Sequence, residues 1–99
     1  MDVLHREAVQ RLFQGILTLQ TVEECGRFFE DACTIKEIEE IAQRFEVATL
    51  LHSGKSYHEI NKQTGASTAT ICRVKKCLMY GSSGYQLVLK RMAEEEEHG

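Results

Sequence analysis

The 99-residue sequence predicts an all-α protein built from six helices. Apolar residues recur at three- and four-residue steps through most of the chain, which is the period of an amphipathic helix. The chain has no proline and seven glycines, most of which stand between the periodic segments. Short turns between helices fit this pattern, and an apolar fraction of 42% is enough to form a core.

The first predicted helix covers residues 2–19, and the second covers residues 21–33. The apolar stripe of the first helix consists of Leu4, Ala8, Leu12, Ile16 and Leu19. Thr21 stands three residues before Glu24, which is the spacing of a capping box. We therefore expect the Thr21 hydroxyl to cap the second helix.

A second capping-box pair, Thr34 and Glu37, opens the longest predicted helix, residues 34–53. One face of this helix is apolar and consists of Ile38, Ile41, Ala42, Phe45, Ala48 and Leu51. Gly54 follows as a stop signal, because glycine readily adopts the backbone conformation that ends a helix.

Three shorter helices are predicted in the rest of the chain, over residues 56–64, 67–80 and 85–93. Ser56 is expected to cap the first of them, with Glu59 three residues later. Serines and glycines separate the last two of them. The final segment, residues 94–99, begins with four glutamates, and we expect it to be a flexible, solvated acidic tail.

The pair of helices from residue 56 to residue 80 has the pattern of a helix-turn-helix. Gly65 tolerates the left-handed backbone that the turn requires, and Ser67 or Thr68 can cap the second helix. Ile60 of the first helix is expected to meet the inner stripe of the second, which consists of Ile71, Val74 and Leu78. The second helix of such a unit is shaped to enter the major groove of DNA.

Positive charge is concentrated on this unit although the whole chain has a net charge of −3. Residues 55–83 carry five Lys or Arg and one acid, a net charge of +4, whereas residues 1–54 carry −5 and residues 84–99 carry −2. A cationic surface at the reading unit is what contact with phosphates requires.

The outer face of the second helix supplies the candidate DNA contacts, which are Ala69, Cys72, Arg73 and Lys76. Its first turn consists of small residues, which let the backbone come close to base edges. Arg73 can reach a guanine edge or a phosphate. The lysines are better suited to phosphates, and they are Lys55, Lys62, Lys75 and Lys76.

The apolar stripes are wide for so short a chain, and six short helices would not cover them all. We therefore expect an intertwined homodimer. The predicted organisation is a single helical domain, residues 1–99, with a dimerisation core (1–54), a helix-turn-helix (55–81), a C-terminal helix (82–93) and the acidic tail (94–99).

Three segments, Thr34–Phe45 (TIKEIEEIAQRF), Ser53–Ser56 (SGKS) and Thr64–Arg73 (TGASTATICR), resemble the Trp repressor family, and in particular a Trp-repressor-like group of small bacterial proteins. The resemblance extends over about residues 12–92. It is most specific at Gly65, Ala66, Ala69, Thr70, Ile71 and Arg73.

This resemblance implies an intertwined all-helical dimer that reads palindromic double-stranded DNA with two recognition helices about 34 Å apart. It also implies DNA contacts that run from the turn into the recognition helix, at Gly65, Ala66, Ser67, Thr68, Ala69 and Cys72. His58 and Asn61 would contribute from the preceding helix. The family carries basic residues at these last two positions, so phosphate contact could move to Lys62.

The resemblance further implies a corepressor pocket in which two arginines, here Arg44 and Arg73, sandwich an indole ring. The family has a glycine where this chain has Val74, whose side chain would intrude on the ring. Cys77 replaces a serine that helps to hold the ligand, and a thiol is a weaker partner. The sequence therefore predicts no tryptophan binding, and any effector is a different molecule. Arg44 is alternatively a structural cation paired with an acid.

The sequence predicts a DNA-binding transcriptional regulator, a repressor, and not an enzyme. No catalytic constellation, zinc-type cysteine spacing or phosphate-binding glycine loop occurs, and neither a cofactor nor a metal is expected. The chain lacks a signal peptide or membrane span, which predicts a cytoplasmic location without membrane contact. The alternative is a helical dimer that interacts with proteins and no longer reads DNA, since the chain is acidic overall.

Overall fold

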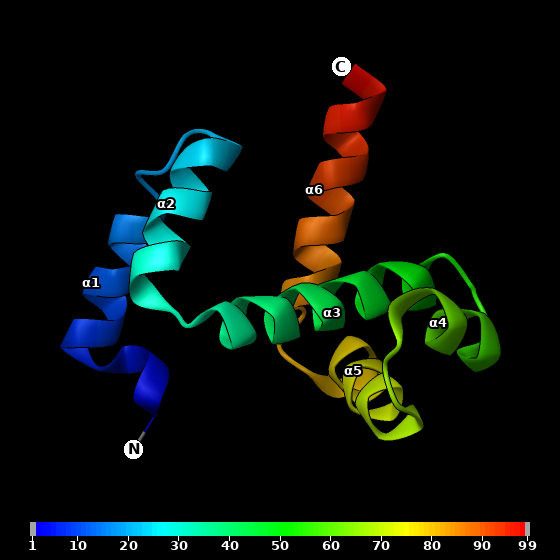
Figure 1. Cartoon of the computed structure of the whole chain (residues 1–99). Coiled ribbons are helices and arrows are strands. Elements are labelled where there is room, and N and C mark those ends of the chain that lie inside the picture. Colours follow the sequence, from blue (N-terminus) through cyan, green and yellow to red (C-terminus); the bar gives the residue numbers. More distant parts are fainter. Residues whose placement is uncertain (1, 99) are drawn as a thin grey trace. The chain divides into compact units, whose positions relative to one another are not determined.

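The computed structural model describes residues 2–98, which form six α-helices, one short 3-10 helix and no strand (Figure 1). The elements are η1 (Val3–His5), α1 (Glu7–Ile16), α2 (Val22–Ala32), α3 (Ile35–His52), α4 (Tyr57–Thr64), α5 (Thr68–Tyr80) and α6 (Gly84–His98). The predicted all-α fold of six helices is therefore confirmed. The chain divides into two compact units, of which the first ends at Ile38 and the second begins at Glu39.

The first predicted helix, residues 2–19, is wrong at both ends. The Asp2 carboxylate accepts a hydrogen bond from the Leu4 amide at 2.9 Å and caps η1, and Arg6 is extended before α1 begins. After α1 the Thr18 hydroxyl donates to the Gly15 carbonyl at 2.7 Å. Short side chains that bond to nearby backbone groups compete in this way with continuation of a helix.

Both predicted capping threonines lie where the sequence places them. The Glu24 amide donates to the Thr21 hydroxyl at 3.0 Å, and the Glu37 amide donates to the Thr34 hydroxyl at 3.1 Å. The Thr34 amide donates in return to the Glu37 carboxylate at 2.8 Å, and this bond lowers the pKa of Glu37. The starts of α2 and α3 thus follow from residues close in sequence.

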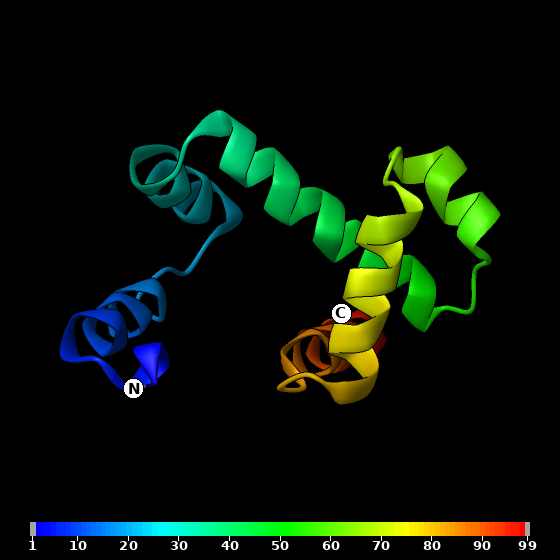
Figure 2. The same ribbon diagram turned by 90° about the horizontal axis from the view of Figure 1, so that it is seen from below.

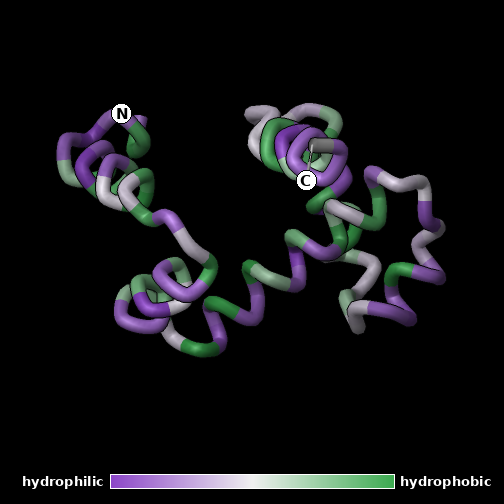
Figure 3. The backbone as a smooth tube through the Cα atoms, turned by 90° about the horizontal axis from the view of Figure 1, so that it is seen from above, coloured by the Kyte–Doolittle hydropathy of each residue, from purple (hydrophilic) through white to green (hydrophobic). Residues whose placement is uncertain are grey.

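The first unit leaves its apolar side chains uncovered. None of residues 2–38 is buried, although the Phe28 and Phe29 rings meet edge to face with centroids 5.3 Å apart. Leu17 is 83% exposed and Val22 is 90% exposed. Hydrophobic and hydrophilic positions alternate along the tube that starts at the N-terminal mark in Figure 3. These helices are amphipathic, and their apolar stripes have no internal core to join.

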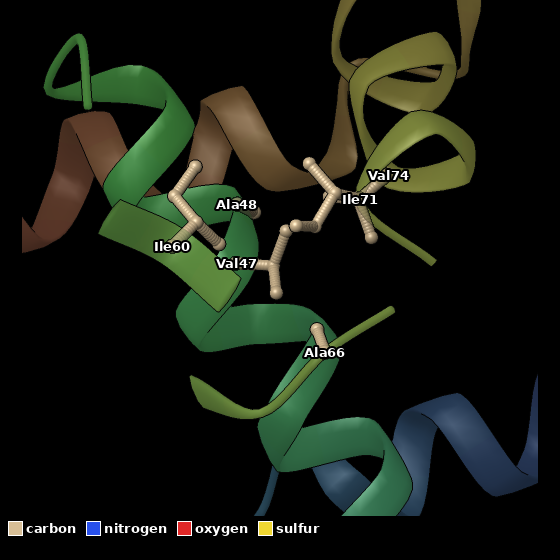
Figure 4. Packing of buried hydrophobic residues seen from close by; sticks show 6 residues of the cluster. All are labelled: Val47, Ala48, Ile60, Ala66, Ile71 and Val74. Atoms are coloured by element: carbon tan, nitrogen blue, oxygen red, sulfur yellow. The ribbon is translucent and has the colours of Figure 1, made fainter. Parts of the chain in front are cut away.

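The second unit contains the core, where side chains from α3, α4, the following turn and α5 meet (Figure 4). Its buried members are Val47, Ala48, Ile60, Ala66, Ile71 and Val74. Each buried valine or isoleucine contributes about 1.5–3 kcal/mol. The expected contact between Ile60 and the inner stripe of α5 is therefore confirmed, and half-buried Leu78 packs against the cluster.

Helix α6 packs against the other helices of the second unit, and its Leu89 is buried. The Tyr85 ring lies 6.5 Å from that of Phe45, and the Gln86 side-chain amide donates to the Leu78 carbonyl. The helix continues to His98, so the predicted helix end at residue 93 is wrong, whereas residues 94–97 are exposed to solvent as expected. Gly99 lies outside the described residues. Glutamate is a good helix former, which favours the extension.

A matched pair of valine substitutions tests the position of the core. Val47 is fully buried, whereas Val88 of α6 is 44% exposed. We expect Val47→Ala to lower the free energy of unfolding by about 2 kcal/mol and Val88→Ala by under about 0.5 kcal/mol, because only the first leaves a cavity. Urea unfolding at one fixed chain concentration measures both. Equal losses would contradict this placement of the core.

Candidate nucleic-acid interface

Helices α4 and α5 form a helix-turn-helix, drawn in light green and yellow in Figure 2. Each of the two helices begins at a serine cap. The Ser56 hydroxyl accepts from the Glu59 amide at 3.2 Å and starts α4. Gly65 ends α4 with φ 73°, the left-handed conformation that glycine adopts without strain. The Ser67 hydroxyl then accepts from the Thr70 amide at 3.2 Å and starts α5.

Side chains of α4 hold the turn through the backbone of Ala66. The Asn61 side-chain amide donates to the Ala66 carbonyl at 2.8 Å, and the Ala66 amide donates to the Thr64 hydroxyl at 3.1 Å. Thr64 also donates to the Ile60 carbonyl at 2.7 Å. Ala66 is 1% exposed, and its backbone amide and carbonyl both have a hydrogen-bond partner. These bonds fix the turn between the two helices.

A further hydrogen bond ties the turn to α3. The Gln43 side-chain amide donates to the Thr64 carbonyl at 3.1 Å, across 21 residues of sequence. Sequence reasoning did not identify Gln43. The neighbours of Gln43 on the helix surface are Glu39, Glu40, Glu46 and Val47, so the sequence places it on a mostly polar face and carries no signal for this contact.

The structure separates the predicted DNA contacts into exposed and internal ones. The predicted contacts that are exposed to solvent are Lys55, His58, Asn61, Lys62, Gly65, Ser67, Thr68, Ala69, Cys72, Arg73 and Lys76. Ala66 belongs to the core, so its side chain is not available to a partner. The Asn61 amide is exposed but bonded to the turn, which gives it a structural role.

Tyr57, Cys72 and Lys75 form a small cluster between the start of α4 and the middle of α5. The Cys72 thiol lies 4.0 Å from the Tyr57 hydroxyl, and the Lys75 ammonium lies 5.5 Å from the centre of the Tyr57 ring. Burial raises the pKa of Tyr57, with a smaller contribution from Cys72, so the phenol stays neutral near pH 7. The predicted phosphate contact Lys75 thus lies over an aromatic ring, which the sequence did not reveal.

The residues that the resemblance assigns to a corepressor differ in burial. Arg44 is half-buried, whereas Arg73 and Cys77 are exposed. Val74 is 1% exposed and fills the space between α5 and its neighbours in the core. The expected clash between Val74 and an indole ring stays a prediction. The predicted roles of Arg44, Arg73 and Cys77 as ligand contacts stay predictions.

Within residues 2–98, no three or more His, Cys, Asp or Glu side chains are placed to hold a metal ion. None of the helices in that range combines the length and apolar character that crossing a lipid bilayer requires.

Known proteins resemble this chain over most of its length. Residues 7–93 match the model of the family described as Trp repressor protein. Uncharacterized protein YerC of Bacillus subtilis (strain 168) is 52% identical over 96 residues, which are 97% of this chain and 92% of that protein.

Solved structures share the fold as well. The crystal structure of a TrpR-like protein from Eubacterium eligens ATCC 27750 matches with a TM-score of 0.88 and 50% identity, covering 91% of this chain and 93% of that chain. A Staphylococcus aureus crystal structure matches with a TM-score of 0.87 and 46% identity, covering 91% and 90% of the two chains.

Two neighbouring substitutions in α4 separate a turn contact from a surface charge. We expect Asn61→Ala to lower the free energy of unfolding by about 1–3 kcal/mol, because it leaves the Ala66 carbonyl without its partner. Lys62→Ala should change that free energy by less than about 0.5 kcal/mol, since Lys62 is exposed. Chemical unfolding monitored by circular dichroism measures both changes. If Asn61→Ala leaves the free energy of unfolding unchanged, Asn61 does not have this structural role in the turn.

Proposed function

This chain belongs to the Trp repressor protein family, and on that premise we propose that it is a sequence-specific DNA-binding transcriptional repressor that acts as a homodimer. The family is one of DNA-binding regulators. The observation that carries the proposal is the capped helix-turn-helix, whose α5 buries Ile71 and Val74 and exposes the opposite face. Such a regulator works where the DNA is, so the proposal includes a cytoplasmic location.

The start of α5 is suited to close approach to DNA. Thr68 and Ala69 are small and exposed, so they leave room for base edges and can pack against thymine methyl groups. The Ser67 hydroxyl caps the helix, and the remaining free amides of the first turn are donors for a phosphate. Cys72 and Arg73 follow one turn later, and Arg73 is long enough to reach a guanine edge or a phosphate.

Charge supports the same surface. Lys55, Lys62 and Lys76 are exposed, and residues 55–83 have a net charge of +4. We assign these lysines, with His58, to phosphates, where they strengthen binding without selecting a sequence. Each phosphate that is neutralised releases counterions, so the affinity for DNA should fall steeply as salt rises.

A second copy of the chain is proposed to cover the first unit. No residue of this unit is buried among residues 2–38, and Leu17 and Val22 are almost fully exposed. A symmetric partner presents the same uncovered stripes, so the two copies can bury each other's apolar surface. The resulting pair of α5 helices would read a palindrome with half-sites about 34 Å apart.

The proposed repressor does not use tryptophan. Val74 is buried in the core, and the family resemblance puts it at the position of a glycine that leaves room for a ring between Arg44 and Arg73. An effector that uses Arg44, Arg73 and Cys77 would therefore have to be smaller than an indole ring or lie flatter against α5 than that ring. DNA binding without any corepressor is the simplest form of the proposal.

A helical dimer that binds other proteins is the second candidate function. Two observations favour it: the Asn61 amide is bonded to the turn, and the chain carries a net charge of −3. The hydrogen bond leaves the Asn61 amide less available to a phosphate, and the net negative charge opposes approach to DNA. The two candidates differ in whether a preferred DNA sequence exists.

Selection of bound duplexes from a random pool tests the proposed function. We expect a palindromic preference and an affinity that declines steeply with salt. Arg73→Ala should weaken binding to the selected duplex by about 1–3 kcal/mol, whereas Lys62→Ala should weaken all duplexes alike. Lys90→Ala in α6 is the matched control and should change neither. No preferred sequence, together with an unaffected Arg73→Ala protein, would favour the protein-binding dimer.

A further inference from the structure

The second unit contains a pocket that none of the roles assigned so far explains. It has a volume of about 550 Å³ and lies between the end of α3, the loop before α4, the second half of α5 and the start of α6. Pockets of this size hold small organic molecules. The arginines predicted for a corepressor, Arg44 and Arg73, do not line it.

The pocket combines an apolar surface with basic groups. Leu51, Leu78 and Met79 supply the apolar surface. The basic groups among its lining are the ammonium groups of Lys55 and Lys75 and the imidazole of His52, and none of the described residues that line it is an acid. A ligand that carries a negative charge is favoured over a neutral or positive one at such a site.

Tyr57 links the basic and apolar parts. It is half-buried at the start of α4 and packs against the core cluster, so its ring has a fixed place in the pocket wall. The Lys75 ammonium lies 5.5 Å from the ring centre, which orients the charge above an aromatic surface. The neutral phenol can donate a hydrogen bond, as a carboxylate requires.

We propose that this pocket binds a small organic acid with an apolar or aromatic body. The carboxylate would lie between Lys55 and Lys75, and the body would pack against Leu51, Leu78 and the Tyr57 ring. Charge-assisted hydrogen bonds supply the selectivity for the acid, and the apolar contacts distinguish it from an inorganic anion. The pocket is not lined by Ala69, Cys72, Arg73 or Lys76 of the outer face of α5, but Lys55 and Lys75 are also predicted phosphate contacts, so the acid and DNA would compete for these two ammonium groups.

Titration of the full chain, without DNA, tests this inference by two-dimensional amide NMR. The probe is 3-phenylpropionate, and its neutral isostere 3-phenylpropionamide is the control ligand. We expect the acid to cause saturable shifts at Lys55, Tyr57, Lys75 and Leu78, and the amide to bind at least about tenfold more weakly.

Charge variants make the test residue-specific. Lys75→Met keeps the aliphatic stem and should weaken the acid about tenfold, whereas Lys75→Arg should retain the affinity. Lys90→Met, on α6 outside this pocket, should leave the affinity unchanged. The circular dichroism of each variant confirms that it is folded.

Three results would overturn the inference. They are equal affinities for the acid and the amide, equal shifts with inorganic phosphate at the same concentration, and no saturable shift up to about 10 mM acid. The second result would identify a plain anion surface. Because no DNA is present, none of them bears on the proposed function, and failure of the DNA selection leaves this titration unaffected.

Discussion

The burial of Ile71 and Val74 against α3 and α4 is the constraint on which the rest of the second unit depends. A helix that turns these two residues inward must turn the opposite positions outward, because its side chains follow a 3.6-residue period. The exposure of Ala69, Cys72 and Arg73 is the direct result. The surface that we propose for DNA contact is thus set by packing on the other side of the same helix.

Features that depend on neighbouring residues could be predicted from the sequence. The serine and threonine caps at Thr21, Thr34, Ser56 and Ser67 need only a partner three residues later, and each is present. The left-handed Gly65 and the inner stripe of α5 are equally local signals. This is why the bounds of α2 to α5 agree closely with expectation, and why the helix-turn-helix could be recognised.

Features that depend on how helices are oriented could not be predicted. The family resemblance implied a DNA contact for Asn61, and nothing along the chain indicated that its amide donates to the Ala66 carbonyl. The partners Gln43 and Thr64, or Lys75 and Tyr57, come from different helices, so no spacing along the chain reveals them. The apolar stripes of the first unit are a second example. A periodic stripe predicts that its residues are buried, but it does not identify the surface against which they pack.

Ala66 gives this protein an unequal tolerance to mutation. Its methyl group and both backbone polar groups are already engaged, so a larger residue there would disturb the core and the turn together. The side chains of Thr68 and Ala69, a few residues later, are exposed to solvent and do not belong to the core. Substitutions at those two positions could therefore change binding preferences at little cost to folding, while the turn at Ala66, which orients α5, stays the same.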